Sequence, residues 1–471
     1  MESPDLHDSE SNVDKPGEEC GIFGGFAHGG DIRFIIRNGL FKLQHRGQES
    51  AGLSCGEDEQ VLVKAKGLVM ESLTDSAIAK APGRFGIGHV RYSSEARTTS
   101  LNAQPYLVKY LEENVAIAQN GFVKKALKIR QKFENIGEIF ITSNYSEVLL
   151  KRIVFGLRKP PSQWTLEEIG NYLGTDFSKG AYSLLLSLPK RIVAFRDPVG
   201  YRPLMFCEAE EGYFVASEDI AFTSLNIKKI VEIMPGEGVE ITEHGYNIAR
   251  YSEQKEERKC VFEHIYFAHP ASNIFGRNVY TTRVELGQRL AEDETITPDI
   301  VVPVVDSGLA SAIGYSTKSG VPLQMGLLRN LWVGRSFIAP TQNARSNIVR
   351  EKLIPNKAVL NGKKIVLVDD SLVRGTTAKE IVNMHRQVGA KEVHFRLASP
   401  MILNICSWGV DIPTLTELIA VQMETEKRIA NEIGADSVRF LPLDKLKAIF
   451  GKEGWCYRCF QKGKQWPKEK V

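Results

Sequence analysis

Residues 363–377, KKIVLVDDSLVRGTT, constrain the fold of this chain more than any other stretch. The apolar run 365–368 is typical of a strand buried on both faces of a parallel sheet, and it ends on Asp369 and Asp370. A turn of small and hydroxylated residues follows, and then helical spacing over 378–387. Free N–H groups at a helix N-terminus bind phosphate, whereas carboxylates suit sugar hydroxyls or Mg²⁺. The stretch therefore predicts a site for a phosphorylated sugar.

Two adjacent aspartates alone would also fit an ordinary strand whose acidic end is solvated. The complete order, an apolar run followed by DDS and RGTT, resembles the phosphoribosyltransferase loop. The resemblance implies that the two acids bind the ribose hydroxyls of phosphoribosyl pyrophosphate and that the loop binds its 5-phosphate. The residues it assigns to these roles are Asp369, Asp370, Ser371, Arg374, Gly375, Thr376 and Thr377.

Composition narrows the class of protein. A chain of 471 residues that is 43% hydrophobic has material for two or three folded domains. Its 60 Lys and Arg against 57 Asp and Glu give no reason to expect nucleic-acid binding. No apolar stretch approaches the roughly 20 residues that cross a bilayer, and residues 1–19 are acidic and lack the apolar segment of a secretion signal. We therefore expect a cytoplasmic protein without a membrane partner, whose seven cysteines are reduced.

The region around Cys20 suggests a second activity. A lone cysteine near a terminus is most often a small buried hydrophobe. Here CGIFGGFA begins at Cys20, and LQHRGQESAGL follows at 43–53. Together they resemble the start of an N-terminal-nucleophile glutamine amidotransferase domain. The resemblance implies that residues 1–19 are a propeptide, and that Cys20, once freed as the first residue, attacks the glutamine amide.

Further landmarks of that family follow along the first half. In HVRYSS, at 89–94, Arg91 and Ser94 take the glutamine-binding positions, where a guanidinium suits the α-carboxylate. Asn120 and Gly121 match the pair that forms the oxyanion hole. The stretches DPVGYRPL and ASEDI, at 197–204 and 216–220, also match.

Two positions depart from the family pattern. Gln119 stands where the family has His, and TSNYSE places Tyr145 where the family has an aspartate that pairs with the glutamine α-ammonium. Loss of a charge-assisted hydrogen bond costs roughly 1.5 to 3 kcal/mol, so we expect glutamine binding to weaken about tenfold to a hundredfold. Asn144 is a candidate for a neutral acceptor in its place.

The second half has the pattern of a parallel sheet. The charged run 253–259 marks the expected domain boundary, with one domain at 20–255 and another at 256–471. Beyond it, helical spacing at 281–292, a strand pattern at 300–305 and helical spacing at 307–319 precede the central strand. The predicted fold is an α+β N-terminal-nucleophile (αββα) glutaminase domain followed by an α/β type I phosphoribosyltransferase domain.

The phosphoribosyltransferase resemblance assigns two more segments. VVDSG matches the pyrophosphate-binding loop, with Asp306, Ser307 and Gly308. Residues 329–355 resemble the flexible catalytic loop, which closes over substrate and excludes water. The basic residues of this loop that suit a leaving pyrophosphate are Arg335, Arg345, Arg350 and Lys352. Mg²⁺, carried in on the pyrophosphate, would lie beside Ser307, Asp369 and Asp370. The substitutions against the family pattern are Arg329, Leu331, Trp332, His269 and Ala271.

The remaining cysteines form a second constellation. A CxxC pair such as Cys456 and Cys459 alone fits zinc, a redox pair or no function at all. Four cysteines occupy the contexts that hold a [4Fe–4S] cluster in the iron–sulfur members of the family, and four thiolates meet its ligand count. These are Cys260, Cys406, Cys456 and Cys459. Zinc is the alternative occupant, and Cys55 and Cys207 are expected to pack in the core.

From Cys20 to Pro467 the chain is similar to the iron–sulfur type of amidophosphoribosyltransferase family. The resemblance implies that ammonia released from glutamine crosses an internal channel and displaces pyrophosphate from phosphoribosyl pyrophosphate, the first step of purine synthesis. It also implies a homotetramer or homodimer and inhibition by purine nucleotides. Two rivals stay open: a paralogue with a weak or dead glutaminase that uses free ammonia, and a nucleotide-sensing module without catalysis. The intact Cys20 disfavours the second.

Overall fold

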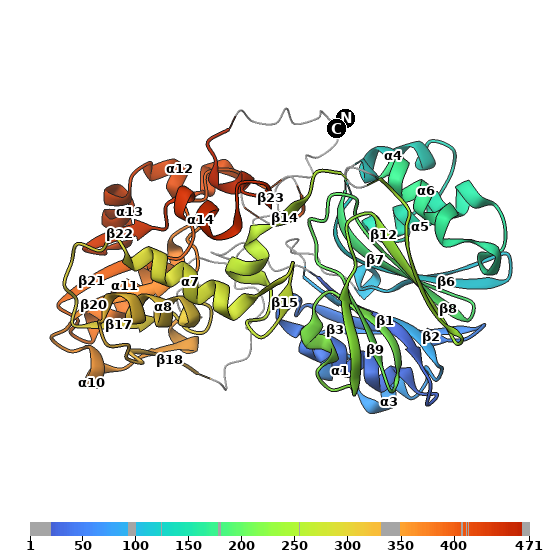
Figure 1. The fold of residues 1–471 in the computed structure, drawn as a ribbon, viewed down its shortest axis with the longest axis horizontal. Helices are drawn as coiled ribbons and strands as arrows, with labels where there is room; N and C mark the ends of the chain where they lie inside the picture. Colours follow the sequence, from blue (N-terminus) through green and yellow to red (C-terminus); the bar gives the residue numbers. More distant parts are fainter. Residues whose placement is uncertain are drawn as a thin grey trace.

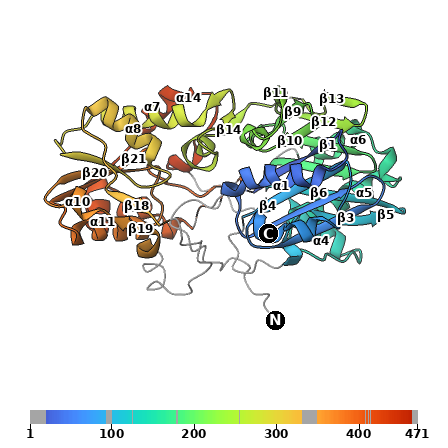
Figure 2. The same ribbon diagram turned by 90° about the horizontal axis from the view of Figure 1, so that it is seen from below.

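The computed structural model describes residues 20–92, 100–123, 125–177, 180–253, 255–330, 349–406, 408–410, 412 and 414–463. Two lobes lie side by side in both views (Figures 1 and 2), the first coloured blue to green and the second yellow to red. The two large antiparallel sheets belong to the first lobe, and a parallel sheet lies in the second. Within the described residues, no helix has the length and apolar character needed to cross a membrane.

The first lobe is a four-layer αββα sandwich, as the sequence predicts. Its seven-stranded sheet has the order β11 (Ile227–Glu232), β9 (Met205–Ala209), β10 (Gly212–Ala216), β1 (Gly21–Ala27), β4 (Phe85–Arg91), β2 (Ser50–Gly56) and β3 (Gln60–Lys66). Its six-stranded sheet has the order β13 (Gly245–Arg250), β12 (Glu237–Thr242), β8 (Arg191–Arg196), β7 (Ala181–Leu188), β6 (Glu113–Phe122) and β5 (Tyr106–Tyr110).

Three apolar cores hold these layers together. The core between the sheets takes alternate residues of each, such as Ile22 of β1 and Leu185 of β7, because successive side chains of a strand face opposite ways. Helix α1 (Ile32–Lys42) packs on the outer face of the first sheet. Helices α5 (Tyr145–Leu157) and α6 (Leu166–Asp176) cover the second. The smaller helices of this lobe are α2 (Val69–Ser72), α3 (Asp75–Ile78) and α4 (Ala126–Glu134).

The second lobe is a doubly wound α/β domain. Its parallel sheet has the order β17 (Ile300–Pro303), β20 (Lys364–Asp369), β21 (Glu392–Leu397) and β22 (Ser437–Phe440). Its helices within the described residues are α7 (Val279–Ala291), α8 (Leu309–Ser319), α10 (Lys357–Leu360), α11 (Thr376–Gln387), α12 (Ile419–Met423), α13 (Glu426–Ile433) and α14 (Leu443–Phe450). Every residue of β20 from Ile365 onward is buried, because helices lie on both faces of the sheet. The predicted fold class is thus confirmed for both lobes.

Element boundaries differ from the sequence predictions by a few residues. Helix α7 begins at Val279 instead of 281, because the Asn278 side chain caps it by accepting from the Thr281 N–H at 3.0 Å. Strand β17 ends at Pro303, and α8 begins at Leu309, so the segment between them is a longer loop than the pattern predicts. This loop is one wall of the predicted pyrophosphate site.

Short strands complete the second lobe. Strand β14 (Arg258–Cys260) pairs in parallel with β23 (Gly454–Cys456), which brings the start of the second half against the C-terminal part of the chain. Strands β18 (Leu327–Arg329) and β19 (Leu353–Pro355) form an antiparallel pair on either side of the segment 330–352. Strands β15 (Asn273–Ile274) and β16 (Arg277–Asn278) form a small hairpin.

Candidate functional site

Cys20 lies at the start of β1, in the middle of the seven-stranded sheet. Gly21 pairs with Val90 of β4, so the antiparallel register brings Cys20 beside the end of β4. The Cys20 thiol lies 3.7 Å from the Tyr92 carbonyl oxygen and is partly exposed. A partly exposed thiol at a strand end is placed to act as a nucleophile. The predicted propeptide, 1–19, lies outside the described residues.

The predicted oxyanion pair lies on the facing sheet. His89 of β4 donates from Nε2 to the Gln119 carbonyl oxygen of β6 at 3.0 Å, which links the two sheets beside the nucleophile. Asn120 is fully buried, and its side-chain N and O atoms have no partner within the described residues. Gly121 has φ +111°, and a Cβ there would lie 2.1 Å from the Ala181 oxygen. An unmet buried amide next to a glycine fits the stabilisation of an oxyanion.

The guanidinium of Arg91 is held by neutral groups. Its Nη1 donates to the Asn102 carbonyl at 2.9 Å and to Asn144 Oδ1 at 2.5 Å. Asn144 in turn donates from Nδ2 to the same Asn102 carbonyl at 2.7 Å. The Asn144 oxygen therefore faces Arg91, so in this structure it is engaged with the guanidinium. Ser94, the other predicted glutamine-binding residue, lies outside the described residues.

Gln119 and Tyr145 are the two departures from the family pattern in this region. Gln119 donates from Nε2 to the Gly121 carbonyl at 3.1 Å, so its side chain holds the backbone of the predicted oxyanion pair in place. Tyr145 is the first residue of α5, and its ring meets Phe122 edge to face at a centroid distance of 5.4 Å. An aromatic contact thus occupies the position at which the family places a carboxylate.

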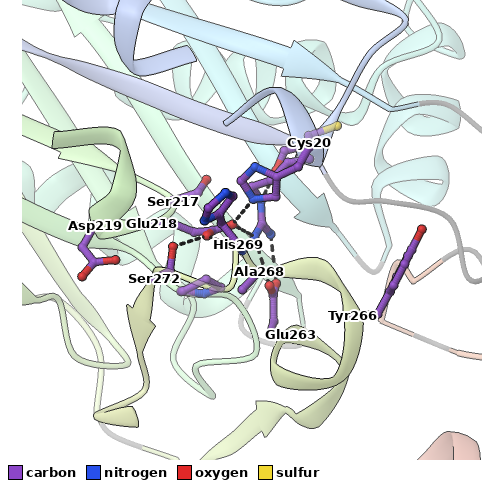
Figure 3. A network of polar contacts seen from close by, with 12 residues as sticks. Cys20, Ser217, Glu218, Asp219, Glu263, Tyr266, Ala268, His269 and Ser272 are labelled. Atoms are coloured by element: carbon purple, nitrogen blue, oxygen red, sulfur yellow. Dashed lines mark hydrogen bonds and ion pairs between the residues drawn. The ribbon is translucent and has the colours of Figure 1, made fainter. Parts of the chain in front are cut away.

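A buried charge network beneath Cys20 was missed by the sequence analysis (Figure 3). Arg46 donates from Nε to the Cys20 carbonyl at 3.2 Å, and its other nitrogens contact Glu218 and Glu263. Burial raises the pKa of Glu218, but His45, Arg46 and Ser272 more than offset this and hold the pKa far below its usual range. Arg46, Glu218 and Glu263 lie in the LQHRGQ, ASEDI and CVFEH stretches, and only their pairing in space reveals the network.

The predicted ribose site lies at the C-terminal end of β20. Asp369, Asp370 and Ser371 are at most 4% exposed. Ser307 Oγ donates to Asp369 Oδ1 at 3.3 Å, which joins the loop after β17 to the acids of β20. Ser371 Oγ donates to Asp370. Buried oxygens at one sheet edge form the kind of donor set that suits sugar hydroxyls or a hard cation.

The predicted phosphate loop leads into α11. Gly375 caps this helix with φ +87°, and a Cβ there would lie 2.4 Å from Ile419 Cδ1. Thr376 and Thr377 open the helix, so their backbone N–H groups belong to the first turn, which is the end of a helix that attracts anions. Arg374 points to Glu417 instead, which accepts from its Nε at 2.9 Å. The loop geometry fits an anion, and Arg374 is turned to a neighbouring carboxylate.

The pyrophosphate segments are described in part. Asp306 and Ser307 precede α8, with Gly308 at its cap, and Asp306 contacts Arg329. Lys352 immediately precedes β19, and Arg350 pairs with Glu380 at 2.5 Å. The remaining predicted loop residues, which lie outside the described residues, are Leu331, Trp332, Arg335 and Arg345.

The four predicted cluster cysteines line one small pocket. Strand pairing sets Cys260 opposite Cys456, and the other walls of the pocket include Cys406 and Cys459. Burial raises the pKa of Cys459, and the three other thiols raise it further, so all four lie within electrostatic range. Burial raises the pKa of Cys406 to about 11. In the described part of the chain, no three His, Cys, Asp or Glu side chains are placed to hold a metal ion as they stand.

A larger cavity of about 350 Å³ adjoins that pocket and shares Cys456 with it. It lies at the meeting of the two lobes, away from both predicted catalytic sites. Tyr201 and Trp408, whose rings stack at 4.7 Å, form part of its wall. The cavity therefore gives solvent a path to the cysteine pocket.

Comparison with known proteins agrees with the family resemblance that the sequence motifs indicate. A family model described as a glutamine amidotransferase domain matches residues 89–224. The chloroplastic amidophosphoribosyltransferase of Glycine max is 41% identical over 451 residues, 95% of this chain and 78% of that one. The amidophosphoribosyltransferase of Methanocaldococcus jannaschii is 40% identical over 93% of this chain and 96% of that one.

A solved structure agrees over nearly all of the chain. The glutamine phosphoribosylpyrophosphate amidotransferase of Bacillus subtilis, complexed with ADP and GMP, superposes with a TM-score of 0.85 at 38% identity. The match covers 95% of this chain and 97% of that one. Near-complete coverage by both sequence and structure, with the two predicted sites in separate lobes, establishes the relationship. The chain belongs to the amidophosphoribosyltransferase family.

Proposed function

We propose that this protein transfers ammonia from glutamine to phosphoribosyl pyrophosphate, giving 5-phosphoribosylamine, glutamate and pyrophosphate in the first step of purine synthesis. The observation that carries the proposal is the presence of both half-sites in one chain. Cys20 immediately precedes β1, and the neighbouring strand β4 is joined through His89 to β6, which carries the buried Asn120. Asp369 and Asp370 lie at the end of β20, before a phosphate-type loop.

In the glutaminase half, the Cys20 sulfur attacks the side-chain amide carbon of glutamine. The S–C bond forms and the C–N bond breaks, while the freed α-amino group of Cys20 takes the thiol proton and passes it to the departing nitrogen, so ammonia leaves and a thioester remains. Asn120 Nδ2 and the Gly121 N–H donate to the oxyanion that develops on the carbonyl oxygen. Arg91 turns from Asn144 to the glutamine α-carboxylate, which is the stronger acceptor. Water then hydrolyses the thioester to glutamate.

In the transferase half, ammonia attacks C1 of the ribose and pyrophosphate leaves. Asp369 and Asp370 accept hydrogen bonds from the ribose hydroxyls, and the N–H groups at the start of α11 hold the 5-phosphate. Asp306, Ser307 and Gly308 bind the pyrophosphate, with Arg335 and Lys352 from the loop before β19. A channel between the lobes is needed because ammonia in water at neutral pH is mostly protonated and not nucleophilic.

The residues at the transferase site also fit a magnesium ion. Ser307 Oγ and the two aspartates offer oxygen donors, which are the ligands that Mg²⁺ prefers. The ion would neutralise the pyrophosphate as it leaves. The chain's own contribution is the buried carboxylate pair that orients the sugar beside it.

The four cysteines fit a [4Fe–4S] cluster. Four thiols around one pocket match its ligand count, and Cys459 is buried beside the three partly exposed ones. Zinc competes for the same donors. Anaerobically purified protein should contain about four iron and four sulfide per chain and absorb in the visible range. Zinc in place of iron would contradict this assignment.

The remaining expectations are part of the same proposal. Removal of 1–19 exposes Cys20, and the domains span 20–255 and 256–471. The protein assembles as a homotetramer or homodimer, acts in the cytoplasm, and is inhibited by purine nucleotides. The Bacillus subtilis relative was solved with ADP and GMP, which supports a nucleotide-binding role for this chain.

The test is pyrophosphate release that depends on phosphoribosyl pyrophosphate, measured with glutamine and with ammonium chloride in parallel. Mass spectrometry first establishes whether the chain begins at Cys20. Turnover with both donors is the expected result. Turnover with ammonium alone would favour the second candidate, an ammonia-dependent transferase, which the aromatic Tyr145 in place of a carboxylate specifically supports. Turnover with neither donor would contradict both.

A further inference from the structure

Arg46 is a fully buried cation at the junction of the two lobes. Its Nε donates to the Cys20 carbonyl at 3.2 Å, and its Nη1 donates to Glu218 at 2.6 Å. Both of its terminal nitrogens also reach Glu263, at 3.0 and 2.9 Å. Figure 3 shows Cys20 above this network and Glu263 below it, on a segment of the second lobe.

Glu263 comes from the other half of the chain, 217 residues after Arg46. It opens the helical turn Glu263–Phe267, and the turn is itself held in place. Arg283 of α7 donates to the carbonyls of His264, Tyr266 and Ala268, each at 2.8 Å. Arg283 also lies within the field of Asp370, one of the two predicted ribose acids. Glu263 is thus fixed to the transferase lobe.

This arrangement leaves the guanidinium little freedom. A bidentate carboxylate sets both the plane and the position of an arginine, and Glu218 holds it from a second side. The side chains of all three residues are fully buried, so a missing partner would leave a charge without compensation. The Nε–H bond therefore points at the Cys20 carbonyl in one defined direction.

The Cys20 carbonyl is a critical point of attachment. When residues 1–19 are removed, no peptide bond precedes Cys20, so its covalent link to the rest of the chain runs through its carbonyl. The sulfur and the α-amino group both extend from that anchored Cα. If the carbonyl shifts, the sulfur and the α-amino group both shift with it. The distance from the sulfur to the glutamine amide carbon tolerates little such displacement.

We propose that Arg46 is a positioning residue for the Cys20 nucleophile and that Glu263 of the transferase lobe holds Arg46 in place, so that the glutaminase site is completed by the other half of the protein. This inference rests on the proposed function, because it assigns to Cys20 the attack on glutamine. It makes the glutaminase dependent on the transferase lobe for geometry as well as for an acceptor of ammonia.

The test is Glu263→Gln in the full-length protein, which keeps the shape of the side chain and removes its charge. We expect kcat for glutamine-dependent pyrophosphate release to fall about 10- to 100-fold, because the guanidinium loses its bidentate partner. The KM for glutamine and the ammonium-dependent rate should each stay within about threefold, because glutamine binding and the ribose site are not touched. A purely structural role would lower both donor activities together.

A matched control variant distinguishes an effect on the position of Cys20 from a loss of folding stability. Glu294 forms a buried pair with Arg396 at 2.6 Å, within the transferase lobe and away from Cys20. Glu294→Gln should lower the melting temperature but leave the ratio of glutamine-dependent to ammonium-dependent rates unchanged. Glu263→Asp retains the charge but moves the carboxylate away from Arg46. It should lower glutamine-dependent kcat selectively, by a smaller factor than Glu263→Gln does. It serves as the test variant if Glu263→Gln fails to fold.

The outcomes distinguish this inference from the proposed function. The inference would be overturned, and the proposed function kept, if the wild type turns over both donors and neither Glu263→Gln nor Glu263→Asp changes the ratio of glutamine-dependent to ammonium-dependent rates. An equal change of ratio in Glu294→Gln would also overturn it, since the effect would then follow from any lost buried pair. Wild-type turnover with ammonium alone would overturn both the inference and the use of glutamine.

Discussion

The two catalytic regions are built in different ways. The residues predicted to bind ribose and phosphate come from one continuous segment, 369–377, at the end of a buried parallel strand. The predicted glutamine site instead gathers Cys20, Arg91 and Asn120 from three neighbouring segments of two sheets, over a network that includes Glu263 of the other lobe. A site made from one turn depends on local backbone geometry, whereas a site gathered from distant segments depends on the whole fold.

The strongest test of this difference removes the nucleophile. Cys20→Ala should lower glutamine-dependent pyrophosphate release by at least about 1000-fold, because no other group can form the thioester. Ammonium-dependent release should stay within about twofold, because the ribose site lies in the other lobe. Parallel assays with the two donors measure both rates. A comparable loss with ammonium would show that the two sites are not separable.

The complementary change lies at the ribose site. Asp369→Asn should lower kcat/KM for phosphoribosyl pyrophosphate about 100-fold with either donor, because a buried carboxylate that accepts from the sugar becomes a neutral amide. Steady-state titration of this substrate with each donor gives the value. A loss confined to the glutamine reaction would contradict the assignment of Asp369 to the sugar.

Restoring the family carboxylate should strengthen glutamine binding. In Tyr145→Asp, the KM for glutamine should fall about 10- to 100-fold, since a charge-assisted hydrogen bond is worth roughly 1.5 to 3 kcal/mol. Ammonium-dependent turnover should not change. Tyr145→Phe is the control, and its KM should match the wild type if the phenol makes no bond to the α-ammonium. An unchanged or higher KM in Tyr145→Asp would mean that other groups bind the ammonium.

Low pH should destabilise the first lobe because His89 is buried in its neutral form. Burial lowers the pKa of His89 from 6.5 to about 3, with a further contribution from Arg91. The unfolded chain therefore binds a proton that the folded one does not, and stability present above pH 6.5 is lost as the pH falls toward 3. By pH 5 the loss should reach about 2 kcal/mol. Urea unfolding at pH 7 and pH 5 should show this loss in the wild type and a smaller one in His89→Gln, and equal losses would contradict it.

Features that depend on one continuous segment could be predicted from the sequence. The apolar run at 365–368, its two acids and the helix after them predicted β20, α11 and a carboxylate pair at the strand end, because each follows from local spacing. The burial of the two acids appears only in the structure. The parallel sheet of the second lobe followed from alternating strand and helix patterns, whereas the αββα fold of the first followed from a resemblance between motifs. Helix boundaries moved where a side chain intervened, as Asn278 does at α7.

Interactions between distant segments could not be predicted. Nothing in the local sequence indicates that Arg46 pairs with Glu263 across 217 residues. Nor does it show that Arg91 donates to Asn144, the residue expected to replace the missing carboxylate. The register that sets Cys260 opposite Cys456 also appears only in the folded chain. Buried charge pairs and strand registers are settled by tertiary packing, which local patterns do not contain.

The most direct test of the account is the ratio of glutamate to pyrophosphate formed when wild-type protein, shown by mass to begin at Cys20, turns over glutamine and phosphoribosyl pyrophosphate without added ammonium. A coupled pair of sites should give about one glutamate for each pyrophosphate. Absence of both products, in protein that releases pyrophosphate when ammonium is supplied, would contradict the claim that this chain joins a working glutaminase to a working transferase.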